Sequence, residues 1–552
     1  AQHIDSDGNR LWDVNGVPLS TMSGEQSSHN LCIDGNGGAF AVWLDKNGSG
    51  TYIGSHLGPN GPGEAVEISS TQNGGFSLEY AGNGEAVMVW KDALVADLRA
   101  QRFNVSMEML WNEGEDNSGR IICDAPGIQS NAKVTTFGDN VIVTWKDLRN
   151  DPDGDVYAQI FTPSGESLLE NNGLAVCDDP AQQASPRVKT DGVNAFIYWE
   201  DKRNEVNNNS NVDPYVQKMD SSGNLLWISN GVQVSNNQAE QISVRMSPDQ
   251  SGGAYFTWVD NRFSPDDSNK GSDIYAQHID IDGSATFGLD GIEIDVDQGV
   301  QGLPLIKTNS LGDAYIIWSD QKSGSDIIIE VQKLTTQGIE FTQNGKEIFY
   351  GQDGDSYLSS TLQVSDGQVL VAFEDQRYHS NLFPGCYTYG LFLDEFSNST
   401  SHDNSAPLSL NEYQGPHDQN SWRRGNLVKS DNRIMMNFTE YSDGFSQYVQ
   451  ALDFNGNLIG GSNGTDVDPS GGVQPYSDIC EMNNNFYVAF TNVVGGYGID
   501  LQKFDANGVA LWTSPKNIAD GSAPIGDPNF GDNYVRKIIA DEVNNNVVVI
   551  YE

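Results

Sequence analysis

One aromatic position repeats along this chain and constrains its fold more than any other feature. It ends a short apolar run ten times, at intervals of 47 to 65 residues. The ten positions are Trp43, Trp90, Trp145, Trp199, Trp258, Trp318, Phe373, Phe438, Phe490 and Tyr551. A recurring period of this length indicates a repeat architecture, in which each copy forms one supersecondary unit.

The copy VIVTWKDLRNDPDGDVYAQIF shows what a repeat contains. Trp145 ends the first apolar run, and Asp147 and Arg149 follow it. After an acidic turn, residues 156–161 alternate around Gln159, with the period of a half-buried strand. Seven copies have aspartate two positions after the aromatic residue, four of these have arginine two positions further on, and glutamine recurs in eight repeats.

The rest of each repeat is rich in turn signals. A Gly turn follows the glutamine segment, and we expect the next Leu-Trp pair, such as Leu226-Trp227, to lie in a third strand. Asn-Gly dipeptides such as Asn230-Gly231 follow and suit tight turns with positive φ. With the run that leads back to the aromatic position, this gives four short strands per repeat and no helical periodicity. The prediction is therefore an all-β fold, a β-propeller of about ten four-stranded blades.

The two ends of the chain suggest how such a propeller closes. The chain starts in a glutamine strand (AQHID) and stops in an aromatic strand (VVVIYE), so we expect both termini to share one blade. Ten blades exceed the usual four to eight. Residues 1–552 could form one large ring, or two tandem propellers of about 1–265 and 266–552, and both readings stay open here.

Repetition favours a scaffold role for the signature residues, because a catalytic site is used once. We expect the aspartate to cap the following turn and pair with the arginine, and the glutamine amide to bond backbone groups. Cys123 and Cys177 hold one position in adjacent repeats and are expected to be buried. The five cysteines are too widely spaced for a disulfide framework or a zinc motif.

Charge and motifs exclude several classes of function. The formal net charge of −46 argues against nucleic-acid binding, which needs a basic surface. No run of about 18 apolar residues is present, so no membrane span is expected. No catalytic motif or cofactor fingerprint occurs, and we nominate no catalytic or cofactor-binding residue. The sequence therefore favours a non-enzymatic role, although a carboxylate pair could still serve a glycosidase.

Some acidic loops between the two signature strands have the composition of calcium ligands. The first contains Asp151, Asp153 and Asp155, and the second contains Asp266, Asp267 and Asp273. Ca²⁺ takes six to eight oxygen ligands, so a short loop would need partners from elsewhere. An ordinary Asx turn is the favoured reading of these loops, and Ca²⁺ at these residues is the candidate cofactor as the alternative.

The repeat W-x-D-x-R…D-[IV]-Y-A-Q-x-[IF]-D-x-x-G-N-x-L-W-x-x-N-G-[VL]-x-V resembles that of large secreted repeat proteins of Bacteroidetes, most clearly from Trp145 to Gln332. The resemblance implies export by the type 9 secretion system to the outer surface or the medium. It supplies no catalytic residue. We expect a binding or adhesion module for a protein or glycan ligand at the cell surface, within a larger assembly. The alternatives are a propeller glycoside hydrolase or lyase acting on extracellular polysaccharide, and a structural subunit of a surface filament or of a secretion or gliding assembly.

Overall fold

The computed structural model describes most of the chain as strands and short turns. The residues that it leaves undescribed are 6, 8, 13–16, 21–24, 47–49, 59–60, 70–74, 93–96, 112–118, 206–211, 263–270, 298, 322–326, 351–355, 366–367, 376–386, 394–407, 410–425, 430–432, 441–445, 453–457, 460–464, 470–476, 493–497, 520–534, 542–545 and 552. For most of 348–427 only the backbone of the strands is described.

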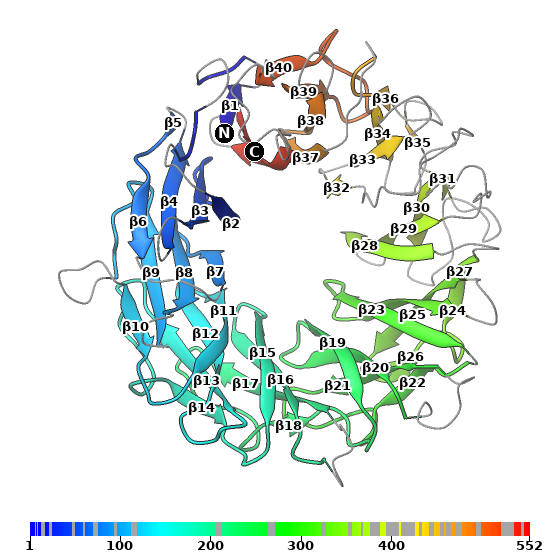
Figure 1. Cartoon of the computed structure of the whole chain (residues 1–552). Coiled ribbons are helices and arrows are strands. Elements are labelled where there is room, and N and C mark those ends of the chain that lie inside the picture. Colours follow the sequence, from blue (N-terminus) through cyan, green and yellow to red (C-terminus); the bar gives the residue numbers. More distant parts are fainter. Residues whose placement is uncertain are drawn as a thin grey trace.

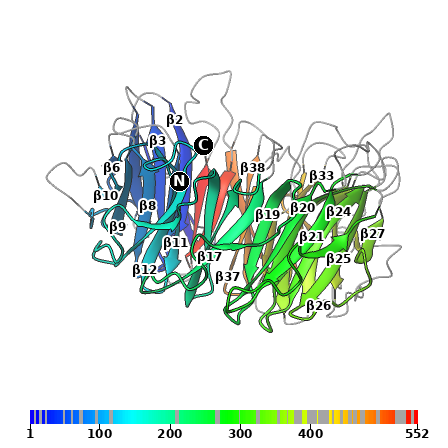
Figure 2. The same ribbon diagram turned by 90° about the horizontal axis from the view of Figure 1, so that it is seen from below.

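The described strands form ten antiparallel sheets, which follow one another around a single ring (Figure 1). Figure 2 shows the ring from its edge, with the strands running from one face toward the other. We number the sheets as blades 1 to 10 from the first complete one. The predicted β-propeller fold is confirmed, and the described residues contain no helix that could cross a bilayer.

The blades of the first half contain the following strands. Blade 1 contains β2 (Gln26–Ile33), β3 (Ala39–Asp45), β4 (Thr51–Gly58), β5 (Gly61–Pro62) and β6 (Val66–Ser69). Blade 2 contains β7 (Phe76–Tyr80), β8 (Glu85–Lys91), β9 (Leu98–Asn104) and β10 (Arg120–Cys123). Blade 3 contains β11 (Gln129–Phe137), β12 (Asn140–Asp147), β13 (Asp155–Phe161) and β14 (Leu174–Cys177). Blade 4 contains β15 (Gln183–Thr190), β16 (Asn194–Asp201), β17 (Asp213–Asp220) and β18 (Val232–Gln233). Blade 5 contains β19 (Gln241–Pro248), β20 (Ala254–Asp260), β21 (Asp273–Ile279) and β22 (Ile292–Asp295).

The remaining blades complete the ring. Blade 6 contains β23 (Val300–Thr308), β24 (Ala314–Gln321), β25 (Ile327–Thr335), β26 (Gly338–Ile339) and β27 (Lys346–Tyr350). Blade 7 contains β28 (Ser356–Ser365), β29 (Gln368–Asp375), β30 (Tyr387–Leu393) and β31 (Leu408–Ser409). Blade 8 contains β32 (Asn426–Lys429), β33 (Ile434–Glu440), β34 (Ser446–Leu452), β35 (Leu458–Ile459) and β36 (Thr465–Asp466). Blade 9 contains β37 (Ser477–Met482), β38 (Asn485–Asn492), β39 (Gly498–Phe504) and β40 (Lys516–Ala519). Blade 10 contains β41 (Val535–Asp541), β42 (Asn546–Tyr551) and β1 (Gln2–Asp5).

The two termini share blade 10, as predicted. β1 pairs antiparallel with β42, and Gln2 lies opposite Val549. Apolar side chains then join this blade to its neighbours on both sides. Val548 packs with Trp43 of blade 1, and Ile4 packs in the core formed with blade 9. The ring is therefore closed by backbone pairing within a blade and by apolar packing between blades.

Each regular blade runs from the axis of the ring to its rim. In blade 3, the inner strand β11 pairs with the tryptophan strand β12, which pairs with the glutamine strand β13 and then with the short outer strand β14. The tryptophan lies between blades, because Trp145 is fully buried among residues of blades 2 and 3. This position removes a large apolar surface from water at every regular interface.

The prediction of a strand at the Leu-Trp pairs is wrong. The chain forms only one isolated bridge there, as between Met219 and Leu225, and the fourth strand follows the Asn-Gly turn instead. The reason is the repeated glutamine. Gln217 Oε1 accepts hydrogen bonds from the backbone N–H of Trp227 at 3.1 Å and of Lys218 at 2.9 Å, and its Nε2 donates to Ile228 O at 2.8 Å. A side chain thus satisfies backbone groups that strand pairing would otherwise need.

The Asn-Gly turns have the predicted geometry. Asn172 and Gly173 both have positive φ, at 67° and 83°, and the turn is closed by Gly173 N, which donates to Glu170 O at 2.9 Å. Gly173 also lies against the tryptophan of its own blade. A Cβ atom built at this position would lie 2.3 Å from Cη2 of Trp145, so both the turn and the packing require glycine.

Candidate metal centre

A repeated frame of charged and aromatic side chains lies between neighbouring blades. In blade 3, Trp145 Nε1 donates to Asp147 Oδ2 at 2.8 Å, and Arg149 Nη2 donates to the same oxygen at 2.5 Å. The guanidinium lies over the ring of Tyr157, with Cζ 3.9 Å from its centroid. It also donates to Cys123 Sγ of blade 2 at 2.9 Å. One arginine therefore neutralises a buried aspartate and joins two blades.

The frame confirms the predicted roles of its residues. The Asp147 carboxylate caps the turn by accepting from Arg149 N at 2.9 Å. Burial alone would raise the pKa of Asp147, but the bonds from Arg149 and Trp145 outweigh it and hold the pKa below its ordinary value. Burial raises the pKa of the Cys123 thiol to about 12, so this buried cysteine stays neutral. The cysteines whose state is described are free, and they are Cys32, Cys123, Cys177 and Cys480.

Two further blades repeat the frame with the same geometry. Arg203 in blade 4 and Arg262 in blade 5 each donate to the aspartate two residues before them, at 2.6 and 2.7 Å. The equivalent aspartates are Asp201 and Asp260, the equivalent tyrosines are Tyr215 and Tyr275, and the residues at the cysteine position are Cys177 and Ser235. A guanidinium thus occupies the same place at three successive interfaces.

The interface between blades 5 and 6 departs from this frame at three positions at once. Glu330 lies opposite Trp318, where a tyrosine faces the tryptophan in blades 3 to 5. Asp295 holds the cysteine position on the outer strand of blade 5. Trp318 Nε1 donates to Asp295 Oδ2 at 2.8 Å rather than to an aspartate of its own blade. Lys322 holds the arginine position in the sequence and lies outside the described residues.

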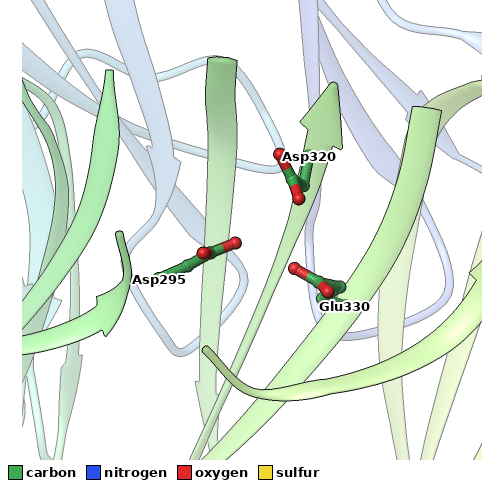
Figure 3. A group of neighbouring side chains, drawn as sticks. All are labelled: Asp295, Asp320 and Glu330. Atoms are coloured by element: carbon green, nitrogen blue, oxygen red, sulfur yellow. The ribbon is translucent and has the colours of Figure 1, made fainter. Parts of the chain in front are cut away.

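These changes bring three carboxylates together. One oxygen each of Asp295, Asp320 and Glu330 lies within 4.8 Å of the others, and the side chains turn toward one another from three strands (Figure 3). Asp295 and Asp320 are 0% exposed and Glu330 is 3% exposed. Three buried carboxylates repel one another strongly in a medium of low dielectric constant unless a cation or protons neutralise them. The group could hold a metal ion, and no other such group of three occurs among the described side chains.

Hydrogen bonds fix two of the three ligands. Gln301 Nε2 donates to Asp320 Oδ1 at 2.6 Å, as Gln129 does to Asp147 in blade 3. Asp295 Oδ1 accepts from the backbone N–H of Asp297 at 3.1 Å, while its Oδ2 accepts from Trp318. Such outer contacts orient carboxylates around a metal before it binds.

The interface between blades 8 and 9 provides an internal comparison. Asp468 and Asp500 approach one another there, and Asn492 stands at the position of Asp147. The Asn492 amide donates to Asp500 Oδ2 at 2.7 Å and to Asp468 Oδ2 at 3.4 Å. Asn517 donates to the other oxygen of Asp500 at 2.8 Å. Carboxylates at this interface are bridged by amides, whereas those between blades 5 and 6 face a third carboxylate.

The first acidic loop of the sequence prediction forms an Asx turn, with one carboxylate turned into the blade. Asp151 Oδ1 accepts from the backbone N–H of Asp153 at 2.8 Å, and Asp153 is exposed. Asp155 lies at the start of β13 and is 1% exposed. The described atoms of this loop do not form a three-carboxylate group. Calcium binding at these three residues stays a prediction.

In the second predicted loop, Asp266 and Asp267 lie outside the described residues, while Asp273 begins β21 and is buried. Burial, followed by the charge of Asp260, raises the pKa of Asp273 to about 7. Asp213 and Asp155 hold the same position in blades 4 and 3, and burial raises their pKa values to about 7 and about 6. These carboxyls carry protons at a pH where an ordinary aspartate has lost them.

The sequence reasoning missed Asp295 and Glu330. Asp320 was recognised only as one of the seven aspartates that follow the repeated aromatic residue by two positions. The signal was divided between two repeats. Asp295 replaces the cysteine or serine of one repeat, and Lys322 and Glu330 replace the arginine and tyrosine of the next. Detecting it requires knowing that these three repeated positions meet across two blades, and only the packing of one blade against the next shows this.

Comparisons with known proteins find only distant structural similarity. The chain matches no protein-family model, and no curated protein sequence matches it. Among solved structures it is similar to an ulvan lyase of a polysaccharide lyase family (9% identity, TM-score 0.37, 72% of this chain and 96% of that one). It is also similar to a puromycin-hydrolysing peptidase of Mycobacterium tuberculosis (12%, 0.32, 75% and 57%) and a post-proline cleaving enzyme of Rickettsia typhi (10%, 0.36, 76% and 56%).

The chain thus spans a little over half the length of these two peptidases. Similarity at this level indicates nothing about the activity of this chain. The resemblance to secreted Bacteroidetes repeat proteins stays a prediction.

Proposed function

We propose that this protein is a non-catalytic binding module in which a calcium ion joins blades 5 and 6. The observation that carries the calcium ion is the replacement of the repeated guanidinium frame by Asp295, Asp320 and Glu330. In blades 3 to 5, one positive group balances the buried aspartate of each interface. Because three carboxylates meet between blades 5 and 6, a doubly charged ion is the matching neutralising group.

Calcium fits the chemistry of these ligands better than other metals. All three side chains offer carboxylate oxygens, and none offers nitrogen or sulfur, which favours a hard cation. Three carboxylates can supply up to about six oxygens when each binds through both, which is the lower end of the calcium range. Zn²⁺ would favour histidine or cysteine ligands.

The non-catalytic part of the proposal is supported by how the chain uses its repeated charged residues. The Asp–Arg pairs are buried within blade interfaces, where they hold the ring together. We further propose that residues 1–552 act as one propeller unit, and the ring in Figure 1 supports this. An extracellular or cell-surface location accords with the acidic composition and with the calcium available there, and the ligand would be a protein or glycan of that surface.

Calcium titration of the stripped protein tests the metal centre. After treatment with chelator, we expect isothermal calorimetry to detect a site that Asp295→Asn/Glu330→Gln removes. Ca²⁺ at about 100 times its Kd should stabilise the fold by about 2.7 kcal/mol, seen as a higher Tm. Asp151→Asn/Asp153→Asn is the matched control, because it removes two carboxylates from the Asx turn and leaves the triad intact.

The variant Lys322→Met tests whether calcium or the Lys322 ammonium neutralises the three carboxylates. If calcium neutralises the triad, this variant binds Ca²⁺ as tightly as the wild type or more tightly. If the lysine does so, the wild type shows no calcium response that depends on Asp295 and Glu330, and Lys322→Met alone lowers the Tm. The second result would overturn the calcium site.

A further inference from the structure

The inner strands of four successive blades carry only basic ionisable side chains. These strands are β11, β15, β19 and β23, which lie nearest the axis of the ring in Figure 1. Their charged residues are Lys133, Arg187, Lys189, Arg245 and Lys307. The whole chain has 76 acidic residues and only 30 lysines and arginines. These four strands have the opposite balance, with five basic residues and no carboxylate. We call these five residues the axial basic patch.

Strand register places the patch on two levels. Lys133, Arg187 and Arg245 each lie opposite the residue that precedes the tryptophan of their blade. Lys189 and Lys307 lie opposite the residue three positions before the tryptophan. Residues two apart on a strand share one side, and the two levels are roughly 7 Å apart along the strands. The five positions therefore repeat from blade to blade rather than being scattered.

A β-bulge precedes each cation of the first level. The register shifts between Ser130 and Lys133 in β11, and shifts occur at the same place in β15 and β19. The residue two positions before the cation has positive φ in all three strands, for example 55° at Asn131. Bulges redirect the side chains that follow them and recur at binding sites. The inner strands thus present Lys133, Arg187 and Arg245 in one common way.

The cations of blades 4 to 6 lie close together. Arg187 Nη1 donates to Val244 O of the next inner strand at 3.4 Å, and Lys189 Nζ donates to Met246 O of the same strand at 2.6 Å. The surrounding inner strands remove part of the water around the Lys189 ammonium, although its side chain keeps an exposed surface, and this desolvation lowers its pKa; the charges of Lys307 and Arg245 lower it further. The patch therefore gathers positive charge from three neighbouring blades into one surface.

No carboxylate of the described chain forms an ion pair with any of the five patch residues. The described ion pairs of Lys and Arg lie elsewhere, in the blade interfaces, in the turns and at Lys46–Glu25. Four of the five residues are exposed, and Arg187 is half-buried. On the described inner strands outside blades 3 to 6, acidic residues occur at Glu79, Asp478, Glu481 and Asp541, and basic residues at Lys429, Arg536 and Lys537, so both signs are mixed there. Blades 3 to 6 thus present positive charge alone along their inner strands, and a surface of one sign attracts an oppositely charged ligand.

We infer that the axial basic patch binds an acidic polysaccharide, a sugar chain that carries carboxylate or sulfate groups at intervals. Cations spread over four blades and two levels match anions repeated along a chain better than they match one small anion. Ser, Thr and Asn side chains lie between the cations on the same strands, including Asn131, Thr135 and Ser243, and they can bond sugar hydroxyls. The net charge of −46 disfavours a duplex nucleic acid, whose charge is dense and extends far beyond the patch.

This inference deepens the proposed binding role and rests on it for its biological meaning, but its residues are separate from the metal triad.

The full chain is assayed with polygalacturonate, dextran sulfate, neutral dextran and duplex DNA at low and moderate salt. We expect binding to at least one acidic polysaccharide that weakens as salt rises, with no binding to neutral dextran. Lys189→Gln/Lys307→Gln should weaken this binding roughly tenfold, and Arg187→Gln/Arg245→Gln at least as much.

Lys46→Gln/Lys516→Gln is the matched control, because it removes two exposed lysines of blades 1 and 9, outside the patch, and should leave affinity unchanged. Thermal unfolding of every variant separates lost binding from lost folding, and the exposed Lys189 and Lys307 serve if the arginine variant unfolds. The inference is overturned if neither acidic polysaccharide binds, if the patch variants bind as the wild type does, or if DNA binds as tightly. Calcium titration of the same samples shows whether the metal site is intact, so that failure of one proposal is distinct from failure of the other.

Discussion

The indole of Trp318 donates its hydrogen bond across a blade boundary to Asp295, at 2.8 Å. In the three preceding blades the tryptophan donates to an aspartate two residues along its own chain. The difference marks the interface where Asp295 and Glu330 replace the cysteine and tyrosine of the repeated frame and Lys322 holds the arginine position. Because the two arrangements occupy the same place, each can be converted into the other by few substitutions.

Restoring the repeated frame should remove the need for a metal. We expect Asp295→Cys/Lys322→Arg/Glu330→Tyr to fold with a Tm that does not change with Ca²⁺ or chelator. The new guanidinium would neutralise Asp320 as Arg149 neutralises Asp147. Thermal unfolding with and without chelator measures this. A variant that keeps its calcium response would show that the ion binds elsewhere.

The Asp147–Arg149 pair should be strongly coupled. Asp147→Ala leaves a guanidinium with lost partners in a buried interface and should cost about 3–5 kcal/mol of unfolding free energy. The double variant Asp147→Ala/Arg149→Met should cost less than the sum of the single changes, because both charges are then absent. Urea unfolding midpoints give the comparison, with Asp153→Ala as the exposed control. Additive costs would mean that the pair contributes nothing beyond its separate contacts.

Two glycines separate backbone strain from side-chain crowding. Gly173→Ala places a methyl group against Trp145, whereas Gly192 has a positive φ of 89° with open space around it. Gly192→Ala should cost about 1 kcal/mol from backbone strain alone. Gly173→Ala should cost about 3 kcal/mol, because the tryptophan must also move. Equal costs in thermal unfolding would show that the turn, and not the packing, selects glycine.

The buried carboxyls of blades 3 to 5 should make the protein more stable in mild acid. The native pKa values of Asp213 and Asp273 are raised to about 7, above the ordinary 3.8, because burial disfavours their charge. Between these limits the native state holds protons that the unfolded chain has released, so the free energy of unfolding falls as pH rises from about 4 to 7. In chelator, the free energy of unfolding should therefore be larger at pH 5.5 than at pH 7.5, by up to about 2 kcal/mol for each of the two carboxyls, which a higher Tm at pH 5.5 would show.

Asp213→Asn/Asp273→Asn isolates this effect from the repulsion of the whole acidic surface. The double variant should gain stability at pH 7.5 and show a shallower dependence on pH than Asp153→Asn, the exposed control. Asp34, Asp147 and Asp249 have lowered pKa values, so their contribution is lost only below the ordinary aspartate range. An unchanged slope in the double variant would contradict the assignment.

The repeat signature predicted the fold because it reports directly on packing. Trp145 had to be buried between sheets, and the alternation around Gln159 had to be a strand with one amide turned inward. The Leu-Trp segment misled because its apolar residues suggested a strand, while the hydrogen bonds of Gln217 fix it as a turn. The effect of a side chain on distant backbone groups does not appear in a local pattern.

The candidate site was less accessible to sequence reasoning for a similar reason. Acidic loops such as Asp151–Asp155 attracted the prediction because their carboxylates are close in sequence. Asp295 and Glu330 are 35 residues apart and belong to different blades. Only the packing of blade 5 against blade 6 shows that they meet. Sites that lie between repeats are best sought where several of the recurring positions change in adjacent repeats.

The strand pair that closes blade 10 also determines how the ring would respond to tension. Gln2 lies opposite Val549 and Asp5 opposite Asn546, so both termini leave the pair at the same end. A pulling force between them would break the hydrogen bonds of β1 and β42 one after another, like a zipper, rather than loading all of them together. Force spectroscopy should record an early, low-force opening of this blade before the other nine unravel. A first event at high force would mean that apolar packing, and not this strand pair, sets the mechanical strength of the ring.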